Sequence, residues 1–258
     1  MKSDALPNEV PAGDAQAVRV LDHDPELAGG LRGQDLELAT RYLVARTVVL
    51  EPGEWRPPWP GSDDPAGHLG ILVIDGLMMR AQRVGPVVPA ELLGSGDLLR
   101  PWRVGDEGSS LESEPTWQVL QRTRIAILDR RFARMAGRWP EVISALMDRG
   151  VQRARLLSFQ MGVGHLRRVD ARLLLLFWRL SDRWGRVTPD GVVLPLGLTH
   201  GWLANLVGAQ RPSVTTALGH LTNAGRIERL EDGSWLLRGG PPNLTEPLFA
   251  AAVSANSS

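Results

Sequence analysis

The chain of 258 residues contains no cysteine and only one lysine, Lys2. The absence of cysteine excludes disulfide bonds, a thiolate nucleophile, cysteine-ligated zinc and cysteine-ligated iron–sulfur clusters. Long apolar runs are lacking too: the densest, Leu173–Trp178, is far shorter than the roughly 20 residues of a membrane-spanning helix. The N-terminal segment lacks the apolar middle region of a signal peptide. We therefore expect a solvated N-terminal tail on a cytoplasmic protein.

Signatures of catalysis are also missing from the sequence. There is no phosphate-binding P-loop, no G-x-G-x-x-G dinucleotide motif and no G-x-S-x-G nucleophile motif. The carboxylate pairs Asp63-Asp64 and Asp22-His23-Asp24 lie in expected loops, where such groups are usually solvated. The sequence predicts that the protein is not an enzyme and binds no metal.

The charge is balanced overall but unevenly distributed. The chain has 29 basic and 29 acidic residues, yet residues 153–238 hold 12 arginines against 6 acidic residues. A basic module joined to an acidic one is typical of a nucleic-acid reader with a separate regulatory domain, although a solvated surface can show the same excess. The preference for arginine over lysine suits phosphate and guanine recognition, but codon bias in a GC-rich genome explains it better.

The first half of the chain, from Leu36 to about Arg131, has the pattern of a β-domain. Short apolar runs, among them Tyr42–Leu50, Leu69–Ile74 and Leu77–Val84, are separated by turn residues. Asp75-Gly76 stands between two of these runs and predicts a β-hairpin there. Six or more short strands indicate a β-roll or jelly roll.

A long helix is expected to follow, beginning at Pro140 and running for about 25 residues, or about 38 Å. Two arrangements would cover its narrow apolar stripe: a coiled-coil-like seam with a second copy, or packing along its own β-domain. Both can hold on different faces. The candidate dimerisation residues are Ile143, Leu146, Gly150, Ala154, Leu157 and Met161.

The basic second half begins with a predicted helix from Ala171 to Trp184. Asp170 is the expected N-cap residue, and Gly185 is expected to end the helix. The apolar run inside this helix is hydrophobic nearly all round, which predicts the core of a second domain.

Residues 198–239 carry the most informative pattern. Thr199 can cap a short helix, and Gly208 permits a sharp turn after it. A second helix begins at Arg211-Pro212 and would bury Val214, Leu218 and Leu221 at helical spacing. Residues 226–238 then read as a β-hairpin. This succession predicts a winged helix-turn-helix.

Burial of Val214, Leu218 and Leu221 leaves polar residues on the outer face of the second helix. They lie near the end that meets base edges in helix-turn-helix proteins. Arg211 can donate two hydrogen bonds to guanine, and Thr215 and Thr216 are further candidates for base contact. For phosphate contact the candidates are Thr199, Gln210 and Ser213. The competing interpretation of Arg211 is a solvated surface arginine.

These motifs resemble the Crp/Fnr family of bacterial transcription regulators. The likeness is carried by L-A-x-L-V-G-A-x-R-P-S-V-T-x-A-L at Leu203–Leu218, by V-G-H-L at Val163–Leu166, and by L-L-G-S-G-D-L-L at Leu92–Leu99. The resemblance implies an α+β architecture of five segments. These are an N-terminal tail (1–30), a cyclic-nucleotide-binding-like β-roll (31–138), a dimerisation helix (139–168), a winged helix-turn-helix domain (169–240) and a C-terminal tail (241–258).

The resemblance also implies partners. They are double-stranded DNA, in the form of a palindromic operator with half-sites one helical turn apart, a second copy of the chain, and RNA polymerase. A competing interpretation is a small-molecule-binding or protein-interaction module whose winged helix does not read DNA.

The effector pocket of the family is altered in this sequence. Members that respond to cyclic AMP have Gly-Glu and Arg-Ser pairs where this chain has Arg100-Pro101 and acidic residues around Glu112-Ser113. Acidic groups there would repel a cyclic phosphate. The candidate pocket residues are therefore Leu99, Arg100, Trp102 and Phe159, for an unidentified ligand or none. The sequence argues against cyclic nucleotides, and the scattered His23, His68 and His165 argue against haem.

Overall fold

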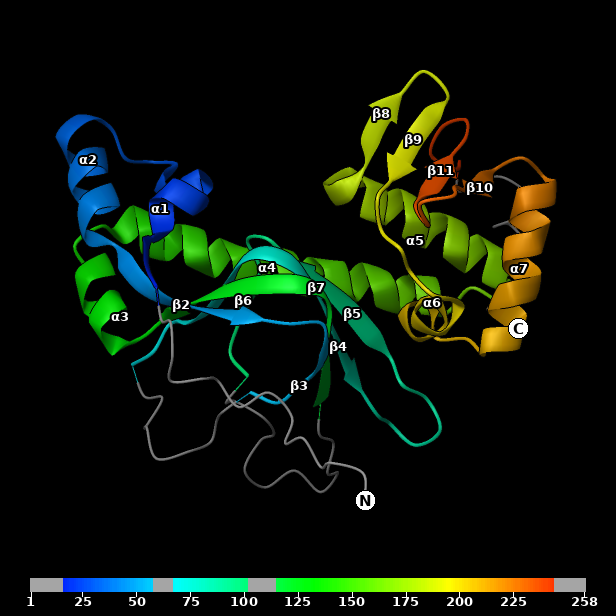
Figure 1. Cartoon of the computed structure of the whole chain (residues 1–258), viewed down its shortest axis with the longest axis horizontal. Coiled ribbons are helices and arrows are strands. Elements are labelled where there is room, and N and C mark those ends of the chain that lie inside the picture. Colours follow the sequence, from blue (N-terminus) through cyan, green and yellow to red (C-terminus); the bar gives the residue numbers. More distant parts are fainter. Residues whose placement is uncertain (1–15, 58–66, 102–114, 244–258) are drawn as a thin grey trace, which may run out of the picture. The chain divides into compact units, whose positions relative to one another are not determined.

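The computed structural model describes residues 16–57, 67–101 and 115–243. The chain folds into two compact units. The first contains Met1–Arg83 and Glu91–Arg155, and the second contains Val84–Ala90 and Leu156–Ser258. The predicted α+β class, with a β-roll, a long helix and a helix-turn-helix, is confirmed (Figure 1).

The first unit is built on a seven-stranded sheet. Its central order is β1-β2-β7-β4-β5, with β3 paired to β7 and β6 to β4. The strands are β1 (Ala17–Arg19), β2 (Val44–Leu50), β3 (Gly53–Trp55), β4 (Gly70–Gln82), β5 (Ala90–Gly94), β6 (Leu98–Leu99) and β7 (Pro115–Leu128). Alternate residues of β4 enter two cores: Ile71 and Val73 join one, and Leu72 and Ile74 the other. This is the two-residue period of a sheet buried on both faces.

The predicted hairpin at Asp75-Gly76 is wrong. Both residues lie inside β4, which pairs with β7 on either side of them through shifts in register at Asp75. Gly76 has φ of +99°, and a side chain there would collide with Thr123 of β7. The Asp-Gly pair thus forms a β-bulge, which shares with a tight turn the need for a residue that tolerates positive φ.

Helices replace parts of the predicted tail and strand pattern at the start of the chain. Residues 17–28, expected in a tail, form β1, α1 (Val20–His23) and the 3-10 helix η1 (Pro25–Ala28), in which Val20 and Leu27 are fully buried. Helix α2 (Gly33–Tyr42) occupies the beginning of the region predicted as strands. After the sheet, Asp129 caps the additional helix α3 (Arg130–Ala136) by accepting a hydrogen bond from the Phe132 backbone N–H at 2.8 Å.

Helix α4 spans Pro140–Gly164, as its proline start and spacing predict. Its first turns contribute Val142 and Leu146 to the core shared with α1, α2 and α3. Among the helices that the described residues form, none is both long enough and apolar enough to cross a membrane.

Among its described residues, the second unit contains the end of α4, three further helices and a four-stranded sheet of order β10-β11-β9-β8. The helices are α5 (Val169–Trp184), α6 (His200–Val207) and α7 (Arg211–Asn223), and the strands are β8 (Arg186–Thr188), β9 (Gly191–Leu194), β10 (Ile227–Arg229) and β11 (Trp235–Leu237). The β8–β9 hairpin was not predicted.

The start of α5 also differs from expectation. Arg168, rather than Asp170, is the N-cap residue, and Asp170 lies buried in the first turn. Its carboxylate accepts hydrogen bonds from the Arg168 guanidinium, with Nε at 3.0 Å, and from the Ala171 backbone N–H at 2.9 Å. Asp170 therefore accepts a hydrogen bond from a backbone N–H at the start of α5, although it lies in the first turn and not at the N-cap position.

Candidate nucleic-acid interface

Helices α6 and α7 form a tight helix-turn-helix (Figure 1). Thr199 caps α6 as predicted, by accepting a hydrogen bond from the Trp202 backbone N–H at 3.2 Å. Gly208 ends α6 in the left-handed conformation, with φ of 61°, which glycine adopts without steric strain. Only Ala209 and Gln210 separate this glycine from α7.

The outward face of α7 is the one that the spacing predicts. Val214, Leu218 and Leu221 are buried, whereas Arg211, Ser213, Thr215 and Thr216 are exposed. No hydrogen bond or ion pair joins the Arg211 side chain to another residue in the described parts of the chain. The guanidinium therefore projects from the first turn of α7 and is available to a ligand.

Two further basic groups lie beside this face, and the sequence did not single them out. His200, the first residue of α6, places its ring Nδ1 2.9 Å from Thr215 Oγ1 on α7. Burial lowers the pKa of His200, and the positive charges of Arg229 and Arg211 lower it further. Arg229 on β10 lies over the Trp235 ring at 5.2 Å. The packing of α6 on α7 brings His200 to Thr215, and the charges of Arg229 and Arg211 both act on its imidazole.

Replacing His200 with glutamine is expected to make the fold less sensitive to acid. Because the folded-state pKa of His200 is lowered, the unfolded chain binds more protons as the pH falls below about 6.5. The stability linked to neutral His200 is thus fully present above that pH and is lost as the pH falls through the folded pKa. Urea unfolding at about pH 7.5 and about pH 5.5 should show a smaller loss for His200→Gln than for wild type. The exposed His220, also replaced by glutamine, is the control, and equal losses in all three proteins would contradict this role.

The turn between α6 and α7 is held from α5 by Arg172, another residue that the sequence did not reveal. Its guanidinium Nη1 donates to the backbone oxygens of Val207 at 3.2 Å and Gly208 at 3.1 Å, and its Nε donates to Leu166 at 2.6 Å. Burial lowers the pKa of Arg172. These bonds satisfy carbonyl groups at the end of α6 and orient α7 relative to α5.

The predicted wing is present as the β10–β11 hairpin. Ile227 pairs with Leu237, and Arg229 with Trp235. The Asp232 side chain accepts hydrogen bonds from the backbone N–H of Ser234 at 2.9 Å and from its hydroxyl, and Gly233 takes a φ of 82°. Trp235 packs on Phe177 of α5 with ring centroids 5.0 Å apart, so the wing is anchored to the core of the unit.

Comparison with known families agrees with this geometry. Residues 168–238 match the family model described as a Crp-like helix-turn-helix domain. They form a Crp-like helix-turn-helix domain. The predicted resemblance to the Crp/Fnr family is therefore confirmed in the part of the chain where its motifs are densest.

Solved structures extend the likeness beyond the Crp-like domain. FixK2 from Bradyrhizobium japonicum superimposes with a TM-score of 0.55 at 16% identity, covering 76% of this chain and 93% of its own. A CRP/FNR-family transcriptional regulator from Thermus thermophilus gives 0.53 at 21% identity, with coverages of 75% and 93%. The c-di-GMP-responsive regulator CLP from Xanthomonas campestris gives 0.52 at 19%, with coverages of 76% and 95%. These likenesses establish the fold of Crp/Fnr regulators. Among proteins with curated descriptions, none is similar enough in sequence to match.

The remaining residues predicted to contact DNA retain groups that can donate hydrogen bonds. Thr199 uses an oxygen lone pair for its cap, which leaves its hydroxyl hydrogen available. Gln210 is the N-cap residue of α7, yet its side chain makes no capping bond. The Ser213 hydroxyl has no hydrogen-bond partner within the described residues. Thr199 lies at the start of α6, whereas Gln210 and Ser213 lie at the start of α7.

The predicted dimerisation residues of α4 divide into two groups. Leu146 is buried in the protomer's own core and Ile143 packs against that core, so these two serve the β-roll. The other four, Gly150, Ala154, Leu157 and Met161, are exposed. Met147 and Val151, with 68% and 48% of their surface exposed, continue the same stripe. The helix therefore has one face that packs in its own domain and a second apolar face on which Met147, Val151 and Met161 are exposed.

Three of the four candidate effector residues lie among the described residues. Leu99 is buried in a sheet core, and Arg100 donates a hydrogen bond to the backbone oxygen of His68 at 2.7 Å. Phe159 is exposed, with the Arg179 guanidinium 5.8 Å from its ring centroid. Trp102 and Glu112 lie outside the described residues. Within the described parts of the chain, no group of three histidine or acidic residues is arranged to hold a metal ion.

A partly buried ion cluster lies between α4 and the sheet of the first unit. Glu91 on β5 accepts hydrogen bonds from Arg153 on α4, at 2.9 Å to Nε and 2.6 Å to Nη2, and pairs with Arg80 on β4 at 3.4 Å. Burial lowers the pKa of Arg80, and the negative charge of Glu91 partly offsets this lowering. Glu91 thus neutralises two partly buried arginines, and it ties β5 to α4.

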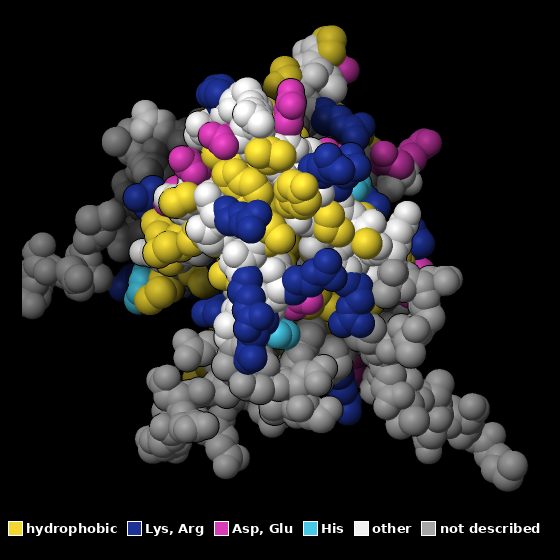
Figure 2. Space-filling view, turned by 90° about the vertical axis from the view of Figure 1, so that its left-hand side faces the viewer, with side chains coloured by type: hydrophobic (Ala, Val, Ile, Leu, Met, Phe, Trp, Pro, Cys, Tyr) yellow, Lys and Arg dark blue, Asp and Glu magenta, His cyan; other side chains and the backbone are white. Residues whose placement is uncertain are grey.

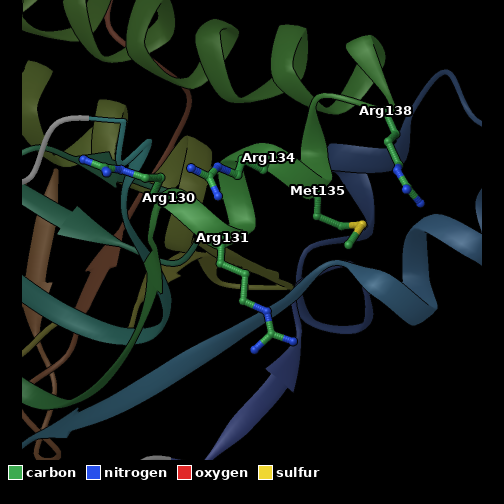
Figure 3. A pocket seen from close by; sticks show the side chains of 5 residues that line it. All are labelled: Arg130, Arg131, Arg134, Met135 and Arg138. Atoms are coloured by element: carbon green, nitrogen blue, oxygen red, sulfur yellow. The ribbon is translucent and has the colours of Figure 1, made fainter.

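The first unit also has a basic surface around α3. Arg130, Arg131, Arg134 and Arg138 line a shallow hollow of about 370 Å³ together with Met135. Figure 2 shows arginine side chains beside exposed apolar ones on this face. The guanidinium groups of Arg131 and Arg134 point in different directions (Figure 3), an arrangement unlike a pocket built for one small anion.

Proposed function

We propose that the protein is a dimeric, sequence-specific DNA-binding transcription regulator of the Crp/Fnr type. The observation that carries this proposal is the exposed, unpaired guanidinium of Arg211 in the first turn of α7, within a domain that matches the Crp-like model. In helix-turn-helix proteins this end of the second helix meets base edges in the major groove. Bidentate donation to O6 and N7 of guanine is the contact that an arginine there makes best.

Groups around Arg211 supply contacts to the DNA backbone. Thr199, Gln210 and Ser213 have donors for phosphate oxygens, and Arg229 on the wing adds positive charge. The twofold excess of arginine over acidic residues across 153–238 raises the positive potential of this unit. Backbone contacts of this kind provide affinity, whereas Arg211 provides sequence preference.

Dimerisation through α4 completes the proposal. The exposed residues Met147, Val151, Ala154, Leu157 and Met161 recur at spacings of three and four, which is the pattern of a two-helix seam. A twofold pair of chains would present two copies of α7 to half-sites about 34–36 Å apart. The operator is then a palindrome.

The proposed regulator does not respond to cyclic AMP and has no catalytic activity. The partly buried Arg80 and Arg153 near β5 are already paired with Glu91 and so are not free to bind a cyclic phosphate. The β-roll is therefore a sensor for a ligand other than cyclic nucleotide, or a purely structural and dimerising module. The proposal includes RNA polymerase as a further partner, on the ground of the likeness to Crp/Fnr regulators alone.

The test is selection of binding sites from random duplexes with the full-length protein, followed by affinity measurements at several salt concentrations. We expect one palindromic site to be enriched. With about six to ten phosphate contacts, its affinity should fall about 10³-fold or more between about 50 and 200 mM salt. A protein whose winged helix does not read DNA would enrich no site.

A further inference from the structure

The hydroxyl of Thr215 is fully engaged inside the protein. Thr215 is exposed on α7 one turn after Arg211, and its Oγ1 lies 3.1 Å from the Arg211 backbone oxygen and 2.9 Å from the Nδ1 of His200. A hydroxyl has a single hydrogen to donate. Both candidate partners for that hydrogen belong to the same domain.

Either tautomer of His200 leads to the same result. If Nδ1 carries the hydrogen, it donates to Thr215 Oγ1, and the hydroxyl donates to the Arg211 carbonyl oxygen. If Nδ1 is bare, the hydroxyl donates to Nδ1 instead. In both cases Thr215 keeps no hydrogen to donate to a base or a phosphate, and only an acceptor lone pair remains.

Thr216 repeats the arrangement without a histidine. Its Oγ1 lies 3.3 Å from the Pro212 backbone oxygen, one turn earlier in α7, and donates to it. Exposed threonines in helices commonly form this bond to the carbonyl four residues before them. Ser213 and Thr199 differ, because their hydroxyl hydrogens are not used in this way.

The methyl groups are then the groups that both threonines can still offer to an outside ligand. The methyl and the hydroxyl diverge from one tetrahedral Cβ, so a hydroxyl directed at the helix backbone turns the methyl away from it. Thr215 and Thr216 are both exposed, and they are adjacent. Arg211 and Thr215 are separated by four residues, about 6 Å along the helix axis, which matches about two base steps of DNA.

We propose that Thr215 and Thr216 recognise thymine through their methyl groups rather than through hydrogen bonds. In the major groove only thymine presents a 5-methyl group among the four standard bases, and a threonine methyl makes apolar contact with it. The inference rests on the proposed DNA-binding function. It adds a specific expectation: each half-site contains thymine within about two base pairs of the guanine that Arg211 contacts.

The experiment removes one methyl group at a time from either side of the contact. In the selected operator, each thymine of a half-site is replaced by uracil, which keeps all hydrogen-bonding groups. The protein variants are Thr215→Val, which keeps a methyl and loses the hydroxyl, and Thr215→Ser, which keeps the hydroxyl and loses the methyl. Because Thr215→Val also removes the partner of His200, Thr216→Val and Thr216→Ser form a second pair that leaves His200 untouched.

For wild type we expect uracil at the contacted position to weaken binding about fourfold, the effect of losing one buried methyl group. The valine variants should keep this preference for thymine over uracil, and the serine variants should lose it at their own position. Wild-type affinity that is indifferent to uracil at every position would overturn the proposal. So would a preference that the serine variants retain and the valine variants lose.

Failure of this inference is distinguishable from failure of the proposed function. If no duplex is enriched in the selection, DNA recognition itself is wrong, and methyl recognition is wrong with it. If a palindrome is enriched but uracil has no effect, only the role of the threonine methyl groups is refuted.

Discussion

Replacing Arg211 with alanine is expected to lower affinity for the selected operator about 5- to 150-fold while changing affinity for random duplexes much less. The size follows from the roughly 1–3 kcal/mol of discrimination that one bidentate arginine–guanine contact provides. Arg211 makes no hydrogen bond or ion pair with another described residue, so its removal should leave the fold intact. Competition binding against operators altered at each position would identify the guanine whose preference disappears.

Two matched variants separate base recognition from simple charge. Arg186→Ala removes one exposed arginine from β8 of the same unit and should change specific and non-specific affinity by the same factor. Arg211→Lys keeps the charge but lacks the planar, two-pronged donor, so it should recover general affinity without restoring sequence preference. If Arg211→Ala lowered affinity equally for every duplex, Arg211 would be a phosphate contact.

Placing a glutamate at Leu157 is expected to convert the protein to monomers. Leu157 is partly exposed on the apolar face of α4, between Ala154 and Met161. In a twofold seam, the two introduced carboxylates would meet in an apolar contact, where unpaired charge is costly. Loss of the second half-site should then reduce operator affinity about 10²- to 10⁴-fold, since the two α7 helices no longer act together.

The matched control for this experiment is Gln152→Glu. Gln152 is also exposed on α4, about 140° around the helix from Leu157, and glutamate there introduces the same charge away from the stripe. Sedimentation should show a dimer for wild type and Gln152→Glu, and a monomer for Leu157→Glu. An unchanged mass for Leu157→Glu would show that the copies associate through another surface.

The helix-turn-helix could be predicted closely because its signals are local. Thr199 caps a helix through a bond to Trp202, three residues away, and Gly208 adopts positive φ between two helices whose apolar residues recur every three or four positions. Each of these features depends on neighbours within one helical turn. The wing follows the same logic, because Asp232-Gly233-Ser234 closes a short hairpin on itself.

The β-roll was predicted in class but not in detail, because its register depends on distant segments. Asp75-Gly76 has the same local signature in a turn and in a bulge, and only the pairing of β4 with β7, some 50 residues later, selects the bulge. Helix α2 was missed for a related reason. The helix is placed by the packing of Ala39 into a core supplied largely by α1, α3 and β7. Its local sequence alone predicts the edge of the region of strands.

The sequence by itself therefore determined the succession of a β-rich unit, a long helix and a winged helix-turn-helix, together with the face of α7 that carries Arg211. It did so because helical period, caps and turn residues act over short range. Tertiary structure alone decided that His200 contacts Thr215 and feels the charges of Arg211 and Arg229, that Arg172 holds the turn, and that Leu146 belongs to the protomer's own core. Those contacts join separate segments of the chain. The number of residues between two segments does not determine their distance in space, so only the packing of the elements could bring them together.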